Sequence, residues 1–363
     1  MHAKPSDEKP PDGPSDQLSR LLRRQLMASA CLLAASSVVP TVLAQAKPER
    51  PRITLAVGGK AALTCLPLTI AEQLGYFRSE GLELDIIDMA GPSTAVQAVV
   101  AGTADVISCG YEHAISQQLR SHFLQAFVMQ GRAPQLVMGV SNRTVPFYQS
   151  VNDLKGRRIG VPGPEPLNSL LPSLLLARAG IRAGEVSFVD LGSTANALAA
   201  LRSGQIDAIS HTDPVMTMLE QKGDVKVISD TRTLKGTQDV YGGPMPSASL
   251  LASAEFIRRF PNTCQALANA MVHALKWLQT AGPGDIIKTV PETYLLGDRA
   301  LYLAAFSKGR ESISLDGLMP DKGPDTVFKA LASQDLALKE ARIDLGKTFV
   351  NGFAQRAKER FRA

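Results

Sequence analysis

A short string of residues occurs twice in this chain, about a hundred residues apart, and this duplication constrains the fold more than any other feature. The two strings are AGTADVISCG at 101–110 and SGQIDAISHT at 203–212, in which Gly, Asp, Ile and Ser recur in register. Solenoid repeats are about 20 to 50 residues long, so this spacing indicates two larger units. We therefore expect two lobes of similar construction.

Each string ends a longer unit in which strands and helices alternate. β-Branched runs at 53–57 and 158–161 predict first strands, and apolar faces that stop before Gly75 and Gly180 predict the helices after them. A second strand, a second helix and the duplicated string then follow in both copies. Units of this kind form parallel sheets that bind ligands beyond the carboxyl ends of their strands. The predicted fold class is α/β, with two facing lobes, a ligand cleft between them and two crossing segments.

The length of 363 residues is sufficient for two ordinary domains. We expect residues 47–140 to form the first part of lobe one and residues 141–243 to form lobe two. A strand at 136–140 is predicted to end the first part, and a Gly- and Pro-rich segment leads back at 241–251. Residues 244–363 complete lobe one and supply the C-terminal helices.

Residues 1–46 have the pattern of a signal peptide. Arg20, Arg23 and Arg24 precede an apolar run, which ends at the small-x-small sequence Ala44-Gln45-Ala46. The run is at the short limit for a membrane span and is rich in Ala and Ser, which favours cleavage near Ala46 over a retained anchor. LRRQLM resembles a twin-arginine signal, so the general and the twin-arginine export routes both stay open. We expect the mature protein in the periplasm, without stable membrane insertion.

Charge and cysteine content argue against several classes of protein. Removal of residues 1–46 lowers the formal net charge only from +5 to +4, and no basic stripe of the kind that binds nucleic acid is present. The chain has no H-E-x-x-H or C-x-x-C sequence, so neither a metal nor a cofactor is expected. Cys65, Cys109 and Cys264 would remain after export, and a disulfide between Cys65 and Cys109 is left open.

Several longer strings carry a resemblance to a known family. PLTIAEQLGYFRSEGLELDI, AVQAVVAGTADV, DLKGRRIGVPGP and ALRSGQIDAISHTDPVM resemble the substrate-binding proteins of ABC importers for nitrate, taurine, alkanesulfonates and pyrimidine precursors of thiamine. The resemblance implies a type II periplasmic-binding-protein-like fold and a monomer. It also implies capture of a small organic solute, sulfonate-like or pyrimidine-like, for delivery to an ABC permease with its ATPase subunit.

The candidate ligand contacts are residues that follow strands or open helices at the expected cleft. Helix N-termini offer unpaired N–H groups, and Tyr111 and Glu112 add an aromatic ring and a charge in a loop where the backbone requires neither. The candidates in lobe one are Thr64, Cys65, Leu66, Ser93, Thr94, Cys109, Gly110, Tyr111 and Glu112. Those in lobe two and at the return crossing are Asn168, Ser169, Ser193, Thr194, His211, Thr212, Asp213 and Tyr241.

The aspartates shared by the two strings have a different predicted role. Asp105 and Asp207 each lie between a helix-ending Gly and a strand, on the side of the strand away from the cleft. We expect their carboxylates to accept local backbone N–H groups and to shape the turn. Neither is predicted to be a catalytic acid.

Two alternatives to transport remain. Cys65-Leu66-Pro67 resembles the segment of sulfinate desulfinases that carries their nucleophilic cysteine, although the turn GPSTAV lacks the histidine expected beside it. A thiolate nucleophile needs such a partner to lower its pKa. The other alternative is a sensor that reports the bound state to a listener other than a permease.

Overall fold

The structure is a computed structural model that describes residues 46–163, 166–192 and 194–363. The predicted signal peptide therefore lies outside the described residues, except for Ala46, as does Ser193. Residues 47–363 form one compact unit. No helix in the described part of the chain has both the length and the apolar surface needed to cross a bilayer.

The first sheet has the strand order β2-β1-β3-β10-β4. Its strands are β1 (Arg52–Gly58), β2 (Glu83–Met89), β3 (Val106–Gly110), β4 (Leu124–Met129) and β10 (Ala248–Ser253). β1 pairs in parallel with β2 and β3, as predicted, whereas β10 runs antiparallel to β3 and β4. Because side chains alternate along a strand, the two faces of β1 enter different cores. Leu55 packs with the residues of α2 (Leu66–Gln73) and α11 (Pro261–Thr280), while Ala56 faces α4 (Pro92–Val100).

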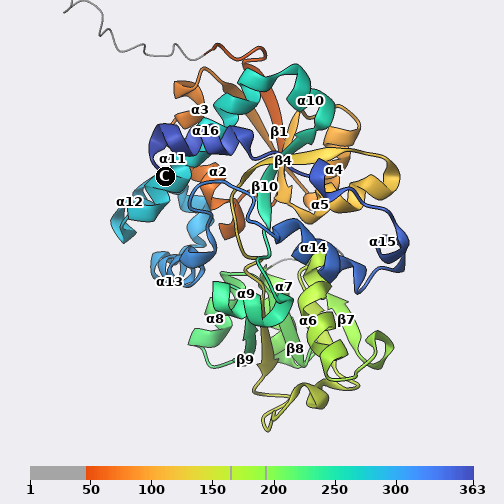
Figure 1. Ribbon diagram of the computed structural model, residues 1–363. Coiled ribbons are helices and arrows are strands. Elements are labelled where there is room, and N and C mark those ends of the chain that lie inside the picture. Colours follow the sequence, from red (N-terminus) through yellow and green to blue (C-terminus); the bar gives the residue numbers. More distant parts are fainter. Residues whose placement is uncertain (1–45, 164–165, 193) are drawn as a thin grey trace, which may run out of the picture. The chain divides into compact units, whose positions relative to one another are not determined.

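The second sheet repeats this arrangement with the order β7-β6-β8-β5-β9. Its strands are β5 (Val137–Ser141), β6 (Arg158–Val161), β7 (Ser187–Asp190), β8 (Ala208–His211) and β9 (Val225–Asp230). Here β5 is the antiparallel strand, between β8 and β9. α6 (Pro166–Arg178) and α9 (Leu234–Tyr241) cover one face, and α7 (Thr194–Ser203) and α8 (Val215–Gln221) cover the other. The duplication in the sequence thus corresponds to two sheets of matching topology (Figure 1).

The first crossing lies earlier in the chain than expected. The strand at 137–141 belongs to the second sheet, so the boundary expected at residue 140 moves to the segment 130–136. Sequence alone could not place this strand, because its antiparallel partners β8 and β9 lie about 70 to 90 residues away in the chain. The return crossing, residues 242–247, runs from the end of α9 to β10. The two crossings are joined where Gly131 N donates to Ala248 O (3.0 Å) and Ser247 N donates to Gly131 O (3.1 Å).

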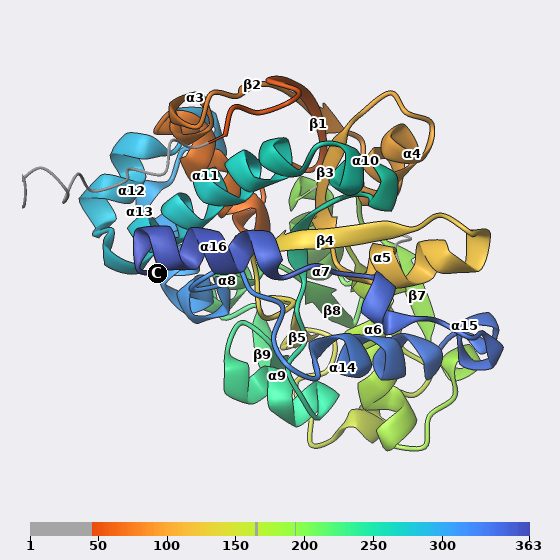
Figure 2. The same ribbon diagram turned by 45° about the horizontal axis from the view of Figure 1, so that its top comes forward.

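The remainder of the chain is mainly helical and returns to lobe one. The predicted apolar stripe of α11 is buried, from Leu267 to Leu278. Two of the later helices also contact lobe two: α13 (Arg299–Gly309) contacts α8, and α14 (Gly323–Ala332) contacts α6 (Figure 2). The other helices are α3 (Tyr76–Ser79), α5 (Glu112–Ser116), α10 (Ala254–Arg259), α12 (Pro283–Thr289), α15 (Leu336–Glu340) and α16 (Gly352–Phe361).

The shared aspartates tie neighbouring strands together. The Asp105 carboxylate accepts the backbone N–H of Thr54 (3.0 Å), and the Asp105 N–H donates to Thr54 O (2.9 Å). Asp207 forms the same pair with Arg158, at 3.0 and 2.8 Å. The predicted structural role is confirmed, but the bonds reach a neighbouring strand instead of the local turn. The glycine before each aspartate has a positive φ, 75° at Gly102 and 81° at Gly204, which explains why both copies need Gly there.

The Asp207 carboxylate is held ionised by its partners. Burial alone would raise the pKa of Asp207, but the backbone N–H of Arg158, the Thr144 hydroxyl and the Arg158 guanidinium together lower it. A carboxylate with a lowered folded-state pKa contributes stability that is present above its unfolded pKa, about 3.9. That contribution is lost as the pH falls through the folded-state value.

We predict that Asp207→Ala lowers the free energy of unfolding by about 2 kcal/mol at pH 7, because a charge-assisted bond is lost and the Arg158 N–H loses its partner. The measurement is urea unfolding followed by circular dichroism. Asp239→Ala, which removes an exposed carboxylate paired with Lys235, is the control and should change stability by less than about 0.5 kcal/mol. The difference between the two variants should shrink as the pH is lowered below about 4. Equal effects at pH 7 would contradict the proposed role of Asp207.

Candidate functional site

The carboxyl ends of the parallel strands in the two sheets face each other. Residues 130–136 connect the carboxyl end of β4 directly to the amino end of β5, which pairs with His211 and Asp230 at the carboxyl ends of β8 and β9. A connection this short leaves no room for either sheet to turn its carboxyl edge away. Ligands of open α/β sheets bind at this edge, so the facing edges define the candidate cleft.

Gln130 Oε1, His211 Nε2 and Tyr241 Oη lie near these edges and are among the buried polar side-chain atoms that have no hydrogen-bond partner in the described part of the chain. Gln130 follows β4, and His211 ends β8. Tyr241 ends α9, just before the return crossing. Leaving a buried polar group without a partner costs about 1–3 kcal/mol, so such groups need an explanation. A polar ligand between the two lobes would satisfy all three.

His211 presents a neutral imidazole in this arrangement. Burial lowers its pKa, against the opposing effects of the Thr212 backbone and the Asp213 charge. Nδ1 lies 3.0 Å from Thr212 N and 3.1 Å from Thr212 O, so the donor and acceptor roles of the two ring nitrogens depend on the tautomer. Nε2 is buried and has no hydrogen-bond partner among the described residues.

The Tyr241 hydroxyl keeps its proton. Burial raises the pKa of Tyr241, and the negative charge of Glu112 raises it further, while Arg178 opposes both. Arg178 is itself engaged, because its guanidinium donates to the carbonyls of Asp239 (3.0 Å) and Val240 at the end of α9. Tyr241 therefore contributes a neutral O–H group, and the charge that acts on it most is the carboxylate of Glu112.

Glu112 begins α5 directly beyond the carboxyl end of β3. Its carboxyl group folds back over Gly110, so a Cβ at residue 110 would require the Glu112 side chain to move. Its side chain is 11% exposed and lies 3.8 Å from His113 Nε2. The predicted pair Gly110 and Glu112 thus acts together, with the glycine making room for the acid.

A cavity of about 720 Å³ opens beside Glu112. It lies between α4 and α5 of lobe one, α6 of lobe two, and the segment from α14 to α15. Its lining residues include Ser93, Glu112, His113, Leu167, Ser169, Leu170, Leu331, Leu336 and Leu338. Three predicted contacts, Ser93, Glu112 and Ser169, are brought together here from both lobes.

Several predicted contacts are part of the packing. Tyr111 is fully buried, and its hydroxyl is hydrogen-bonded to Thr348, so the prediction that it contacts ligand is corrected. Leu66 and Cys109 are buried in the hydrophobic cores of lobe one. Both cores also contain residues of the C-terminal helices, and the local sequence does not reveal this packing.

Asp213 is also a structural residue. It accepts the Thr217 N–H at 2.8 Å near the start of α8 and forms an ion pair with Arg232 at 3.0 Å, in which both side chains are 3% exposed. Burial lowers the pKa of Arg232, but Asp230 and Asp213 more than compensate and raise it. A buried charge of this kind must be paired, which accounts for Asp213 without a ligand.

The remaining candidates lie in the first turns of helices or in loops. Ser93 and Thr94 lie in the first turn of α4, whose N-cap is Gly91. Asn168 donates to Gly163 O at 3.3 Å and braces its own loop. Thr212 lies within hydrogen-bonding distance of the neighbouring His211 ring, and its carbonyl also accepts the Met216 N–H at 3.4 Å. Ser193 lies outside the described residues, and of Thr194 only the backbone is described, as the first residue of α7.

Cys65 has a buried, protonated thiol. Burial raises its pKa to about 11, with Asp88 adding to the shift and hydrogen bonds from Thr64 and Ser108 reducing it. The hydrogen bond with Cys65 therefore accounts for Thr64 better than a contact with ligand does. Ser108 in turn accepts from Gln130 Nε2 at 2.8 Å, which links this thiol to the cleft edge. A thiol with so high a pKa is a poor nucleophile.

Sequence reasoning missed Gln130 and the charge cluster around Arg232. Gln130 stands at a strand end, as the predicted contacts do, and that position was the available signal. Arg232 also pairs with Glu220 (2.9 Å), whose second oxygen pairs with Lys308 of α13 (2.7 Å). This chain of charges connects the interior of lobe two with a helix that follows lobe one's last strand.

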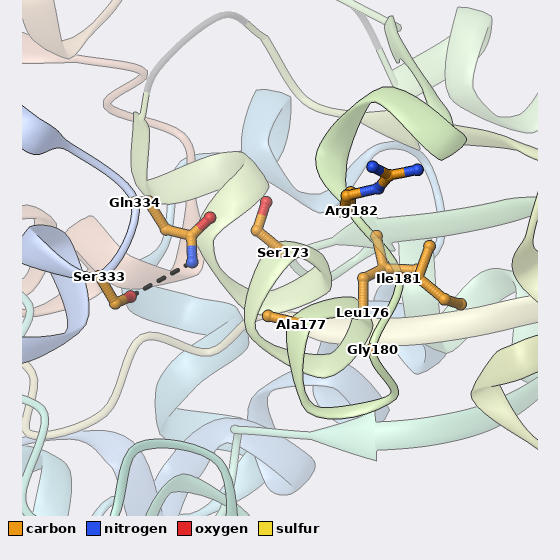
Figure 3. Close-up of a pocket in the computed structure, with 8 residues that line it drawn as sticks. All are labelled: Ser173, Leu176, Ala177, Gly180, Ile181, Arg182, Ser333 and Gln334. Carbon is orange, nitrogen blue, oxygen red and sulfur yellow. Dashed lines mark hydrogen bonds between the residues drawn. The ribbon is translucent and has the colours of Figure 1, made fainter.

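A second cavity, of about 430 Å³, lies along the outer half of α6 and beside Ser333 and Gln334 (Figure 3). Gln334 Nε2 donates to Ser333 Oγ (3.2 Å), and Arg182 pairs with Glu185 (3.4 Å). The cavity is far along α6 from the carboxyl end of β6, so it is not part of the cleft. No group of acidic, His or Cys side chains in the described ranges is arranged to hold a metal ion.

Comparisons with known proteins agree with this geometry. A family model described as NMT1/THI5 like matches residues 63–281. The riboflavin-binding protein RibY of Chloroflexus aurantiacus is 26% identical over 193 residues, which cover 49% of this chain and 53% of that protein. The match thus spans about half the length of that curated relative.

Solved structures cover more of the chain. A protein from Bordetella bronchiseptica RB50 is 48% identical, with a TM-score of 0.80 over 88% of this chain and 100% of that one. The alkanesulfonate-binding protein SsuA of Xanthomonas axonopodis pv. citri, bound to MOPS, is 18% identical, with a TM-score of 0.63 over 83% and 99%. These matches confirm the expected type II periplasmic-binding fold. The desulfurization enzyme DSZB also matches (16% identity, TM-score 0.61, 86% and 99% covered), so the fold alone does not separate binding from catalysis.

The cysteines provide a test of the site chemistry. All three described cysteines are free and buried, so we predict that residues 47–363 in native form react slowly with Ellman's reagent at pH 8, where about one Cys65 thiol in a thousand is ionised. After denaturation without reductant, three thiols should titrate. One rapid native thiol that disappears in Cys65→Ala would contradict the buried, protonated state, and fewer than three thiols would indicate a disulfide.

Proposed function

Because the chain belongs to the NMT1/THI5-like family, we propose that it is an extracytoplasmic solute-binding protein that captures a small organic solute in the cleft and delivers it to an ABC importer. The observation that carries the proposal is the set of buried polar atoms without a described partner: Gln130 Oε1, His211 Nε2 and Tyr241 Oη. An acceptor on Gln130, a hydroxyl on Tyr241 and an imidazole nitrogen on His211 suit a solute that has both donors and acceptors.

The proposal also covers the location, oligomeric state and partners of the protein. The signal peptide is cleaved near Ala46 and the mature protein works as a monomer in the periplasm, where it meets a permease and its ATPase subunit. The two lobes would each present a surface to the permease.

Catalysis by Cys65 receives less support than binding. The thiol pKa of about 11 and the absence of a histidine from the turn after β2 both disfavour a thiolate nucleophile. The similarity to a riboflavin-binding protein favours an organic heterocycle over nitrate as the class of solute. No observation favours a sensor over a transport protein.

A thermal-shift screen of residues 47–363 tests the proposal. The panel contains nitrate, taurine, alkanesulfonates, pyrimidines and riboflavin. We predict that an organic member binds and, at about a hundred times its Kd, adds about 2.7 kcal/mol to the free energy of unfolding. Gln130→Ala and His211→Ala should each weaken that binding about tenfold, since each removes one buried hydrogen bond of about 1.4 kcal/mol.

Matched controls for both substitutions are available in lobe one. Gln125 and His122 lie at the amino end of β4, away from the cleft. The substitutions Gln125→Ala and His122→Ala should therefore leave the affinity unchanged. If no solute binds while a sulfinate is consumed and Cys65→Ala abolishes its consumption, the protein is an enzyme instead.

A further inference from the structure

A chain of hydrogen bonds lies beneath the cleft edge of lobe one. Gln130 Nε2 donates to Ser108 Oγ (2.8 Å), and Ser108 is also hydrogen-bonded to the Cys65 thiol. Gln130 directly follows β4, Ser108 lies within β3, and Cys65 ends a short 3-10 helix that follows β1. The three residues are 1%, 2% and 6% exposed. At this burial each polar group needs a hydrogen-bond partner, because exchange with bulk water is excluded.

The direction of each bond follows from its donors and acceptors. Burial raises the pKa of Cys65, and the bond from Ser108 opposes that rise, as a hydroxyl that donates to the sulfur does. With its one proton used in this way, Ser108 Oγ can only accept, and the amide N–H group of Gln130 is the donor. The Gln130 carbonyl therefore points away from Ser108, and its Oε1 is buried with no partner among the described residues.

Lobe two repeats the serine but lacks its partner. Ser210 occupies the position of Ser108 in the duplicated string. Thr231 follows the edge strand β9, as Gln130 follows the edge strand β4. The Thr231 hydroxyl donates to Leu136 O (2.7 Å), and Ser210 Oγ is buried without a hydrogen-bond partner in the described part of the chain. Because the second sheet forms without a serine–glutamine bond, the bond in lobe one is not a requirement of the fold.

From the direction of these bonds and their absence in lobe two, we infer that Ser108 is a positioning residue. Held by Cys65, it orients the Gln130 amide so that Oε1 is the atom that lobe one presents to the solute. The inference rests on the proposed function and adds the residues that set the polarity of one contact. It also gives Cys65 a role for which no thiolate is needed.

The orientation is tested in the unliganded protein by the exchange of the Gln130 side-chain amide protons with solvent, followed by NMR on nitrogen-15-labelled residues 47–363. The signal is assigned by its loss in Gln130→Ala. We expect one of the two protons to exchange at least about tenfold more slowly than the corresponding proton in Ser108→Ala, where its acceptor is missing. Rapid exchange of both protons in the unmodified protein, or equal rates in the two proteins, overturns the orientation.

The positioning role is tested by affinity. The probe is the member of a set of five solutes (riboflavin, thymine, taurine, butanesulfonate and nitrate) that gives the largest thermal shift. We expect Ser108→Ala to weaken its binding about fivefold, because the freed amide turns an N–H group toward the solute for part of the time. In a Gln130→Ala background the same substitution should change the affinity less than about twofold, since Ser108 acts only through Gln130. Ser108→Thr, which keeps the hydroxyl, should bind the probe at least about threefold more tightly than Ser108→Ala.

Cys65 supplies a second pair of variants, which leaves Ser108 and Gln130 in place. Cys65→Ala removes the acceptor of the Ser108 hydroxyl, which is then free to donate to Gln130 Oε1 and to reverse the amide. Its affinity for the probe should fall about fivefold, whereas Cys65→Ser, which keeps an acceptor, should bind at least about threefold more tightly than Cys65→Ala. Ser249→Ala is the matched control, because it removes a buried hydroxyl on the neighbouring strand β10, which donates to Cys109 O at 3.4 Å. Its affinity should equal that of the unmodified protein.

The outcomes separate this inference from the proposed function. If Ser108→Ala and Cys65→Ala leave the affinity unchanged, or weaken it equally with and without the Gln130 side chain, the positioning role is overturned and solute binding stands. If none of the five solutes shifts the melting temperature, the proposed function and the positioning role fail together. The proton exchange rates still decide the orientation of the amide in that case.

Discussion

Two short crossings determine the architecture of this protein. Residues 130–136 and 242–247 are hydrogen-bonded to each other at Gly131, so the sheets cannot separate their carboxyl edges at this point. Every feature of the cleft depends on that constraint, because a parallel sheet collects helix N-termini and strand-end loops at one edge only. With both edges facing, Gln130 of one lobe and His211 of the other come to border the same space, although they are about eighty residues apart in sequence.

The duplicated strings predicted much of the fold because strand and helix periodicity is a local property. The first three strands of each sheet, the helix between them and the positive-φ glycines at 102 and 204 all follow from residues close in sequence. The sheet to which β5 or β10 belongs does not follow from nearby residues, because both strands are antiparallel insertions whose partners are distant in the chain. A strand's pattern shows that it is buried, but it does not show which sheet buries it.

The candidate site was predicted less completely, for a similar reason. Glu112, Ser93 and Ser169 do line one cavity, and His211 Nε2 has no partner among the described residues, as expected at a strand end. Tyr111 and Asp213 were equally suitable as ligand contacts, but each is bonded to a residue that the sequence could not place beside it. Tyr111 is hydrogen-bonded to Thr348, and Asp213 forms an ion pair with Arg232. A polar group at a strand end is free for a ligand only when the tertiary structure supplies no other partner, and that condition is not local.

Glu220 is shared between two cations, since its two oxygens bind Arg232 inside lobe two and Lys308 on α13. The two ion pairs differ in their dependence on the surroundings. The Lys308 side chain is 37% exposed, and such pairs weaken as ionic strength rises. Arg232 is buried and also pairs with Asp213 and Asp230, so loss of the Lys308 contact would leave no buried charge unpaired. Higher salt would therefore loosen α13 from lobe two without weakening the interior of that lobe.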